Sequence, residues 1–213
     1  MSARIDAVLF DFGGVFTHSP FDAVEQLGEE MGARPGHLRE IVFGPYHEDT
    51  DHPWHRLERG EISLLDARDE VISIGRSEGL DFDPFALLAR ATAGRGVRQE
   101  FVDCAHALRE RGIRTAMVTN NVREFSETWQ KMIPVETLFD LIVDSSAIGM
   151  RKPAHAIYHF ALTGLGRVAP ERAVFLDDYP ANVEAAVDVG LHGVLVEADS
   201  TGALAALERI LSD

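Results

Sequence analysis

The sequence predicts an α/β fold with a doubly wound parallel sheet and an inserted helical segment. Short, continuous apolar runs recur along the chain, and such runs are typical of strands buried on both faces of a parallel sheet. From residue 97 onward these runs alternate with helical patterns, which is the order of a doubly wound sheet. Residues 17–93 interrupt this order, because they show no strand pattern after the first run.

The apolar runs predict five strands, of which the third in chain order is the weakest. They lie at residues 7–10, 115–118, 141–143, 173–176 and 193–196. Apolar residues at helical spacing predict helices between and after the later strands, at residues 97–111, 154–165, 181–189 and 201–211. Gly112 and Gly190 follow two of these helices and are typical C-terminal caps.

The segment after the first strand carries its own helical patterns, at residues 21–31, 37–43, 63–75 and 84–91. We expect residues 17–93 to form a helical cap domain, and residues 1–16 with 94–213 to form the α/β core domain. The glycines at residues 94–96 are expected to act as the return hinge. A separate N-terminal domain is disfavoured, because one strand alone cannot form a sheet.

Composition excludes several classes of partner. The chain has 35 acidic and 20 basic residues and a formal net charge of -15 at pH 7. Such a charge repels nucleic acids and anionic membranes, so neither is expected as a partner. No run approaches the ~20 apolar residues of a membrane helix, and Arg4 and Asp6 interrupt the only early apolar run, so no signal peptide is expected. The single cysteine, Cys104, favours a reducing, cytoplasmic location. A monomer and a homodimer are both compatible with these features.

Polar residues follow the predicted strands, where ligands bind in doubly wound sheets. Asp11 comes directly after the first strand, and Gly13 and Gly14 permit a sharp turn that brings backbone N–H groups toward an anion. Thr119 and Asn120 follow the second strand and are suited to hold an anion at a helix N-terminus. These residues are therefore expected at one edge of the sheet.

Charged residues follow two later elements. Lys152 stands at the start of the helix at residues 154–165. Asp177 and Asp178 follow the fourth strand, and two adjacent carboxylates suit a hard cation that prefers oxygen ligands. A carboxylate, a hydroxyl, a lysine and an acid pair are thus predicted to meet at the carboxyl edge of the sheet.

This order of motifs resembles that of the haloacid dehalogenase-like hydrolase superfamily, and the resemblance covers the whole chain. Its four motifs are matched in order by Asp11, Thr119, Lys152 and the pair Asp177 and Asp178. The insertion resembles the helical cap of members that carry their cap after the first motif. Residues 54–62 (WHRLERGEI) resemble a cap segment of relatives whose first motif also contains two glycines.

The resemblance implies a hydrolase of small phosphorylated metabolites. Asp11 would attack phosphorus and form an aspartyl phosphate, which water then hydrolyses. Lys152 would neutralise the phosphoryl oxygens, and Thr119 would donate a hydrogen bond to one of them. The groups expected to bind the substrate are Asn120, the Gly14 backbone and Trp54. A packed position inside the cap is equally compatible with Trp54.

The resemblance also implies Mg²⁺ as the cofactor. The expected ligands are the Asp11 carboxylate, the Gly13 carbonyl and a carboxylate of the acid pair. Asp178 is the expected direct ligand, whereas Asp177 is expected to contact the metal through water or to orient Lys152.

Gly13 departs from the family pattern, because phosphatases of the family usually carry a second aspartate there for proton transfer. General acid–base catalysis typically raises a reaction rate by about 10²–10⁴-fold, so its loss should lower the rate of hydrolysis. Another group could supply the proton: the candidates are His18, His47, His52 and His55. Alternatively, the substrate has a good leaving group, as in a sugar 1-phosphate, or the protein binds phosphate with little turnover.

A second enzyme class also fits part of the pattern. The superfamily includes 2-haloacid dehalogenases, whose aspartate attacks carbon without a metal. They lack the second aspartate as this chain does, but they usually place an aromatic residue at the position of Gly13. The acid pair Asp177 and Asp178 favours magnesium, and therefore phosphate, over this alternative.

Overall fold

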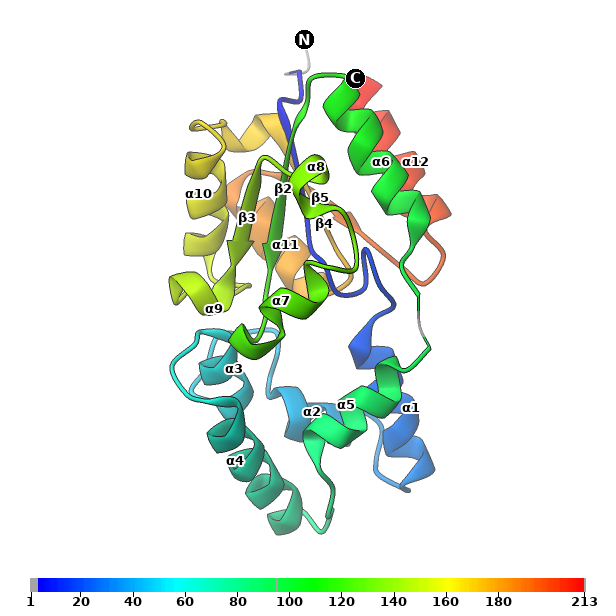
Figure 1. Cartoon of the computed structure of the whole chain (residues 1–213), viewed down its shortest axis with the longest axis vertical. Helices are drawn as coiled ribbons and strands as arrows, with labels where there is room; N and C mark the ends of the chain where they lie inside the picture. Colours follow the sequence, from blue (N-terminus) through cyan, green and yellow to red (C-terminus); the bar gives the residue numbers. More distant parts are fainter. Residues whose placement is uncertain (1–3, 95, 213) are drawn as a thin grey trace.

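The structure of the protein, a computed structural model, describes residues 4–94 and 96–212. In this part of the chain a five-stranded, fully parallel sheet has the order β3-β2-β1-β4-β5 (Figure 1). Its strands are β1 Ala7–Phe10, β2 Arg114–Thr119, β3 Leu141–Asp144, β4 Ala173–Asp177 and β5 His192–Leu195. The predicted α/β class is therefore confirmed, and the strands begin and end within a residue of the predicted bounds.

Helices cover both faces of the sheet (Figure 1). One face is covered by α6 (Gln99–Glu110) and α12 (Thr201–Ser212), the other by α10 (His155–Gly164) and α11 (Pro180–Val189). Along β1, Val8 and Phe10 belong to the core under α6 and α12. Ala7 and Leu9 belong to the core under α10 and α11. Both sides of the strand are therefore buried, which explains its unbroken apolar run.

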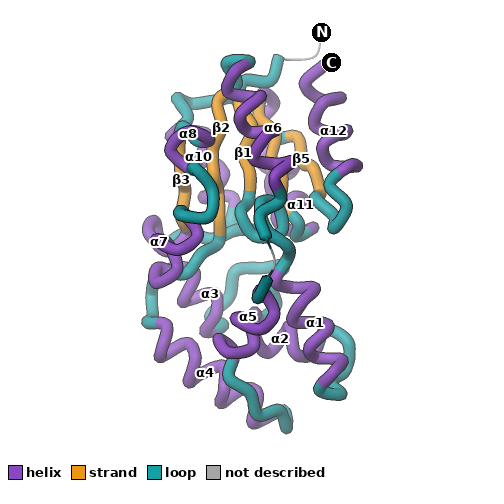
Figure 2. The backbone as a smooth tube through the Cα atoms, turned by 45° about the vertical axis from the view of Figure 1, so that its right-hand side comes forward, coloured by secondary structure: helices purple, strands orange, loops and turns teal. Residues whose placement is uncertain are grey.

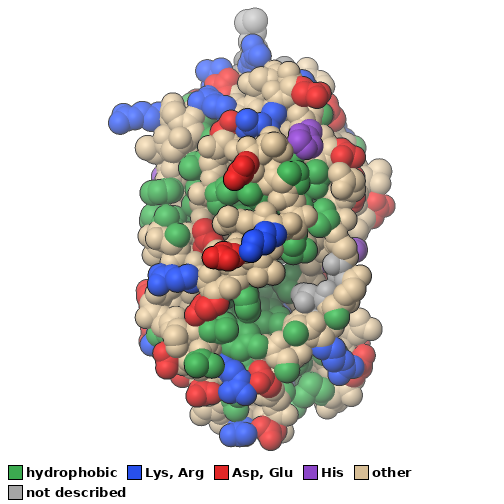
Figure 3. Space-filling model, in the orientation of Figure 1, with side chains coloured by type: hydrophobic (Ala, Val, Ile, Leu, Met, Phe, Trp, Pro, Cys, Tyr) green, Lys and Arg blue, Asp and Glu red, His purple; other side chains and the backbone are tan. Residues whose placement is uncertain are grey.

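Five helices inserted between β1 and α6 form what we call the helical lobe, at one end of the sheet (Figures 1 and 2). They are α1 Pro20–Glu30, α2 His37–Phe43, α3 Pro53–Glu58, α4 Leu64–Ser77 and α5 Pro84–Thr92. The lobe has an apolar core, which includes Val24, Leu38 and Leu57 and is joined by Val122 from the segment after β2. The boundary between the lobe and the rest of the protein is hollowed and lined by hydrophobic side chains on the face shown in Figure 3. The division into cap and core domains at residues 17 and 93 remains a prediction.

Several short elements were not predicted, because three to six residues cannot show a helical period. Besides α3, they are η1 Arg123–Phe125, α7 Ser126–Trp129, α8 Val135–Leu138, α9 Ser145–Ile148 and η2 Pro170–Arg172. Arg95, within the predicted hinge at residues 94–96, and residues 1–3 lie outside the described residues. Across the described ranges, every helix is too short or too polar to span a lipid bilayer.

Candidate active site

The predicted site lies at the carboxyl end of β1, where the order in which the strands follow one another across the sheet reverses. β1 lies between β2 and β4, and a crevice opens at the carboxyl ends of strands around such a switch point. Asp11 directly follows β1, and its N–H donates to the Leu176 carbonyl at 2.8 Å, which extends the pairing with β4. Thr119 is the buried last residue of β2, and Asp177 is the last residue of β4. Three of the four predicted motifs thus reach one edge through adjacent strands.

Lys152 joins these residues from the loop before α10. Its side chain is fully buried, and its Nζ lies 2.8 Å from Asp11 Oδ1 and 2.6 Å from Asp177 Oδ2. Burial opposes the charged form, but the carboxylates of Asp11 and Asp177 outweigh it and raise the pKa of Lys152. The lysine is therefore a fixed positive charge beside the predicted nucleophile.

The two members of the acid pair have different surroundings. Asp177 is fully buried, and besides Lys152 it accepts hydrogen bonds from the Tyr179 N–H at 2.8 Å and from Asn182 Nδ2 at 3.1 and 3.2 Å. Asp178 instead borders a cavity. This geometry favours Asp177 as the residue that orients Lys152 and leaves Asp178 as the more available cation ligand.

The carboxylates are crowded enough to fit a cation. Asp11, Asp177 and Asp178 each offer an oxygen atom, and these atoms lie within 4.8 Å of one another. Burial raises the pKa of Asp11 to about 7; Lys152 opposes this rise, and Asp177 adds to it. Burial, with the charges of Asp177 and Asp11, raises the pKa of Asp178 well above its usual range. The site thus concentrates more negative charge than one lysine balances, and an all-oxygen donor set suits a divalent cation such as Mg²⁺.

The two glycines after Asp11 differ in how much space surrounds them. Gly14 has φ +76°, and a Cβ atom there would lie 2.0 Å from the carboxylate of Asp178, so only glycine fits. A Cβ atom on Gly13 would meet only Pro20 Cδ, at 3.9 Å. Position 13 therefore has room for a Cβ atom, whereas position 14 does not.

Arg98 is a site residue that the sequence did not reveal. Its buried guanidinium donates from Nη1 to the Gly14 carbonyl at 2.7 Å, and from Nη2 to the carbonyls of Glu197 at 3.1 Å and Ala198 at 3.3 Å. It thereby ties the loop after Asp11 to the segment after β5. Its only sequence signal is an arginine just after the return from the insertion, and arginines at such positions are usually exposed.

A cavity of about 370 Å³ borders this loop. Its lining includes Gly14 and Asp178 from the site, and His18, Ser19 and Asp22 from the segment that enters the helical lobe. His18 is therefore placed beside the site. A cavity with hydroxyl, imidazole and carboxylate groups in its walls suits a polar ligand.

The other three histidines considered from the sequence, His47, His52 and His55, are placed elsewhere. His47 lines an open surface cavity beside α10 and α11. His52 Nδ1 accepts a hydrogen bond from the Trp54 N–H at 3.2 Å and caps α3, and His55 Nδ1 accepts from the Thr50 N–H at 3.0 Å. Burial lowers the pKa of His52 to about 4 and that of His55 to about 3. Both imidazoles are neutral at pH 7 and serve the packing of the lobe, so neither is a suitable proton donor.

These two histidines predict an acid sensitivity of the fold. Their pKa values are lower in the folded state than the 6.5 of a free histidine, so below pH 6.5 the unfolded chain binds protons that the folded chain does not. Lowering the pH from 7 to 5 is expected to cost up to about 2 kcal/mol at the buried His55 and less at the partly exposed His52. Urea unfolding at both pH values, for wild type and for the double variant His52→Asn/His55→Gln, measures this difference.

The double variant should lose less stability than wild type over this pH range. Carboxylates such as Asp11 and Asp178 contribute equally to both proteins, so the difference isolates the histidines. His106→Asn, at an exposed position of α6, is the control and should keep the wild-type pH dependence. An identical loss in the double variant would contradict this explanation.

Asn120 and Trp54, both predicted to bind substrate, are engaged within the protein. Asn120 Oδ1 accepts from the Lys152 N–H at 2.7 Å, and Asn120 Nδ2 donates to the Lys152 carbonyl at 3.0 Å. Trp54 is 7% exposed, packs against Phe43, and donates from Nε1 to Glu58 Oε1 at 2.7 Å. The geometry therefore favours Asn120 as a support of Lys152, and favours the packed alternative for Trp54.

Comparisons with known proteins agree with this fold and motif order. Residues 5–190 match the family model described as haloacid dehalogenase-like hydrolase. Bifunctional epoxide hydrolase 2 of Rattus norvegicus is 30% identical over 223 residues, which cover 99% of this chain and 39% of that protein. The chain thus spans about two fifths of the length of that relative. A sesquiterpene phosphatase of Aspergillus oryzae is 28% identical over 204 residues, which cover 91% of each chain.

Solved structures share the fold at lower identity. A haloacid dehalogenase family enzyme of Bacteroides thetaiotaomicron, solved in complex with magnesium and inorganic phosphate, superimposes with a TM-score of 0.62 at 19% identity. The superposition covers 92% of this chain and 98% of that one. At this identity the likeness shows the fold alone.

Proposed function

The chain belongs to the haloacid dehalogenase-like hydrolase family, and on that premise we propose that it is a magnesium-dependent phosphomonoesterase. The observation that carries the proposal is the position of Lys152, 2.8 Å from Asp11 and 2.6 Å from Asp177. A buried ammonium group beside a carboxylate nucleophile suits a substrate with several negative oxygens. The Aspergillus relative, by its name, is a phosphatase as well.

In the proposed reaction an oxygen of Asp11 attacks phosphorus, and the P–O bond to the leaving group breaks with its electron pair on the departing oxygen. That oxygen takes up a proton. Water then attacks the phosphorus of the aspartyl phosphate, loses a proton, and releases inorganic phosphate and the Asp11 carboxylate. Lys152 stabilises the phosphoryl oxygens in both steps, and Thr119 and the loop at Gly14 contact them.

The metal fits the crowded carboxylates. Asp11, Asp178 and the Gly13 carbonyl would hold Mg²⁺, whose charge lets the anionic nucleophile and substrate approach each other. Asp177, saturated by Lys152, Tyr179 and Asn182, would orient the lysine.

Proton transfer requires a group other than Gly13, and we propose His18. Among the histidines considered from the sequence, it alone lines the cavity that Gly14 and Asp178 border. The polar lining of this cavity also agrees with a sugar 1-phosphate, whose hemiacetal oxygen leaves more easily than an ordinary alkoxide.

The metal requirement predicts a clear response to chelation. Hydrolysis of p-nitrophenyl phosphate by wild type should fall to background with excess EDTA and return with Mg²⁺. Asp178→Asn should raise the Mg²⁺ concentration for half-maximal activity by about tenfold or more, because it removes a charged ligand. Asp188→Asn, at an exposed position of α11, is the matched control.

Three outcomes of this assay separate the alternatives. Activity that depends on Mg²⁺ supports the phosphomonoesterase. Turnover that survives excess EDTA would contradict the magnesium-dependent phosphomonoesterase. A wild-type protein inert toward both p-nitrophenyl phosphate and acetyl phosphate would favour the phosphate-binding alternative over the phosphomonoesterase.

A further inference from the structure

A buried ion pair joins the helical lobe to the segment that carries Lys152. Arg151 is fully buried, and its Nε donates to Oε2 of Glu58, at the end of α3, over 2.8 Å. Its guanidinium carbon lies 4.6 Å from the ring centre of Tyr46, and its Nη1 donates to the Glu48 carbonyl at 3.1 Å. The arginine adjacent to Lys152 is thus surrounded by groups of the inserted segment.

A chain of hydrogen bonds also connects Glu58 with the backbone of Lys152. The Tyr46 hydroxyl donates to Glu58 Oε1 at 2.8 Å and accepts from Asn120 Nδ2 at 3.1 Å. Asn120 in turn binds both the N–H and the carbonyl of Lys152. Ser145 adds a third contact, because its hydroxyl donates to the Glu58 carbonyl at 2.6 Å. Glu58 therefore reaches Lys152 from two directions, through Arg151 and through Tyr46 with Asn120.

We propose that Glu58 is a positioning residue, which holds Lys152 between Asp11 and Asp177 from the helical lobe. A buried charge pair is costly to break, and without Glu58 the only ion-pair contact given for Arg151 is the longer one to Asp49, at 3.6 Å. A catalytic group must be held to within a fraction of an ångström, and supporting contacts of this kind fix it. The inference rests on the proposed function for its catalytic consequence. It does not rest on that function for the position of Lys152.

Two substitutions separate positioning from simple stabilisation. Tyr46→Phe and Trp54→Phe each remove one hydrogen bond to the same oxygen of Glu58, at 2.8 and 2.7 Å. Both keep an aromatic ring, and Tyr46→Phe leaves Arg151 and Glu58 paired. Only the tyrosine hydroxyl also contacts Asn120. Trp54→Phe is therefore the matched control.

The chain offers a direct probe of the lysine, because Lys131 and Lys152 are its only lysines. Lys131 is exposed, whereas Lys152 is fully buried. Acetylation with N-hydroxysuccinimide acetate, followed by mass spectrometry, measures the labelling rate of Lys152 relative to that of Lys131. We expect Tyr46→Phe to raise this ratio by about fivefold or more and Trp54→Phe to leave it near the wild-type value.

Kinetics provide the second readout. Tyr46→Phe should lower kcat for p-nitrophenyl phosphate about tenfold with little change in KM, and melting temperatures of the two variants should fall by similar amounts. Equal labelling ratios and equal kcat values in the two variants would overturn the proposal and leave Glu58 as a stabiliser of the lobe. If wild type lacks phosphatase activity, the proposed function fails, yet the labelling ratios of these variants and of Glu58→Gln still decide whether Glu58 positions Lys152.

Glu58→Gln tests the residue itself, with Glu61→Gln as its control. Glu61 also accepts from an arginine of the helical lobe, since Arg59 Nε lies 2.7 Å from Oε1, but this pair lies at the surface. We expect Glu58→Gln to raise the Lys152 labelling ratio above that of Tyr46→Phe. Glu61→Gln should keep the wild-type ratio. If Glu58→Gln does not fold, the comparison of Tyr46→Phe with Trp54→Phe carries the test.

Discussion

Asp11→Asn should reduce phosphatase turnover by at least about 10³-fold, because an amide cannot replace the attacking carboxylate. We expect Asp11→Asn to fold and to keep the thermal stability of wild type. The substitution relieves the crowding of Asp11 with Asp177 and Asp178, and Lys152 keeps its ion pair with Asp177 at 2.6 Å. Steady-state hydrolysis of p-nitrophenyl phosphate and a thermal melt of the same sample measure both effects.

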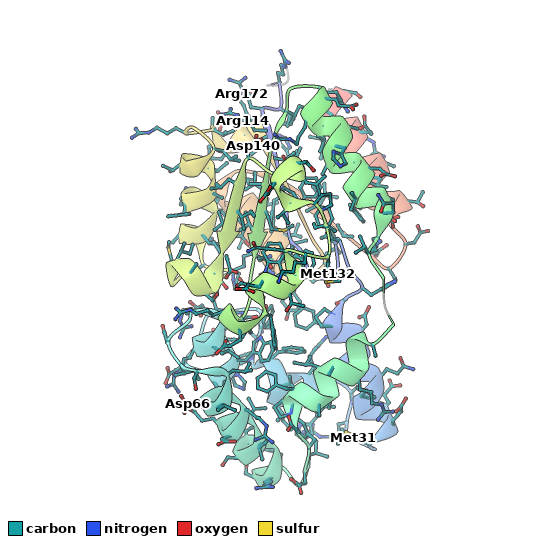
Figure 4. The ribbon with its side chains drawn as sticks, viewed as in Figure 1. Met31, Asp66, Arg114, Met132, Asp140 and Arg172 are labelled. Carbon is teal, nitrogen blue, oxygen red and sulfur yellow. The ribbon has the colours of Figure 1, made fainter. Side chains whose placement is uncertain are left out.

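The matched control is Asp6→Asn, at the residue that precedes β1, so it lies at the opposite end of this strand from Asp11. Asp6 pairs with Arg172 at 2.6 Å on a partly exposed surface, and Figure 4 places Arg172 at the end of the sheet away from the helical lobe. This variant should keep wild-type turnover and lose less than about 1 kcal/mol of stability. Covalent catalysis by Asp11 would be contradicted if Asp11→Asn folded, bound Mg²⁺ and retained activity. Trapping of labelled phosphate on wild type, and not on the variant, provides the direct check.

Gly13→Asp is expected to increase activity, which is an unusual result for a substitution beside a nucleophile. An added Cβ would meet only Pro20 Cδ at 3.9 Å, which is an ordinary van der Waals contact. The new carboxyl group would protonate the leaving oxygen, a contribution typically worth about 10²–10⁴-fold. We expect kcat/KM for a sugar 6-phosphate to rise by about 10²-fold, and for p-nitrophenyl phosphate by less than about threefold, because nitrophenolate needs no proton.

The same panel tests the leaving-group argument. Wild type should prefer a sugar 1-phosphate to the 6-phosphate of the same sugar, and Gly13→Asp should narrow the preference. Gly202→Asp is the control, since an added Cβ there meets no atom within 4 Å. If wild type shows no preference between the two esters, the leaving-group argument is wrong. If the Gly13→Asp variant folds and binds Mg²⁺ but its kcat/KM for the sugar 6-phosphate does not rise, proton transfer does not limit the rate.

His18 can be assigned within this series. In the wild-type background, His18→Asn should slow the sugar phosphates more than p-nitrophenyl phosphate. In the Gly13→Asp background it should have little effect, because the aspartate then supplies the proton. An equal effect of His18→Asn in both backgrounds would exclude His18 as the group that replaces the missing aspartate.

Much of the site followed from local sequence, because parallel strands bring their carboxyl ends to one edge. Asp11, Thr119 and Asp177 end or follow buried strands, so their meeting could be predicted as soon as the strands were recognised. The strands themselves were recognisable because both faces of the sheet are covered and their apolar runs are unbroken. Short elements such as α3 could not be recognised, because Pro53–Glu58 is shorter than the window in which a helical period can be detected.

Other features depend on contacts between residues far apart in the chain. The sequence predicted that Trp54 and Asn120 contact a substrate, but it could not show that Glu58 and Lys152 already occupy their polar groups. It likewise identified four histidines as possible proton donors, and only the fold separates His18, which lines the cavity, from those that pack or face elsewhere.

The sequence by itself determined the fold class, the family and the order of the four motifs, because these depend on periodicity and on residues at strand ends. Only the tertiary structure decided how much room surrounds Gly13, which carbonyls Arg98 holds, and that Glu58 of the helical lobe is paired with Arg151 next to Lys152. Space and buried pairing are properties of segments that meet after folding: 93 positions separate Glu58 from Arg151. No local pattern encodes such a distance, so the supports of the site became visible only in three dimensions.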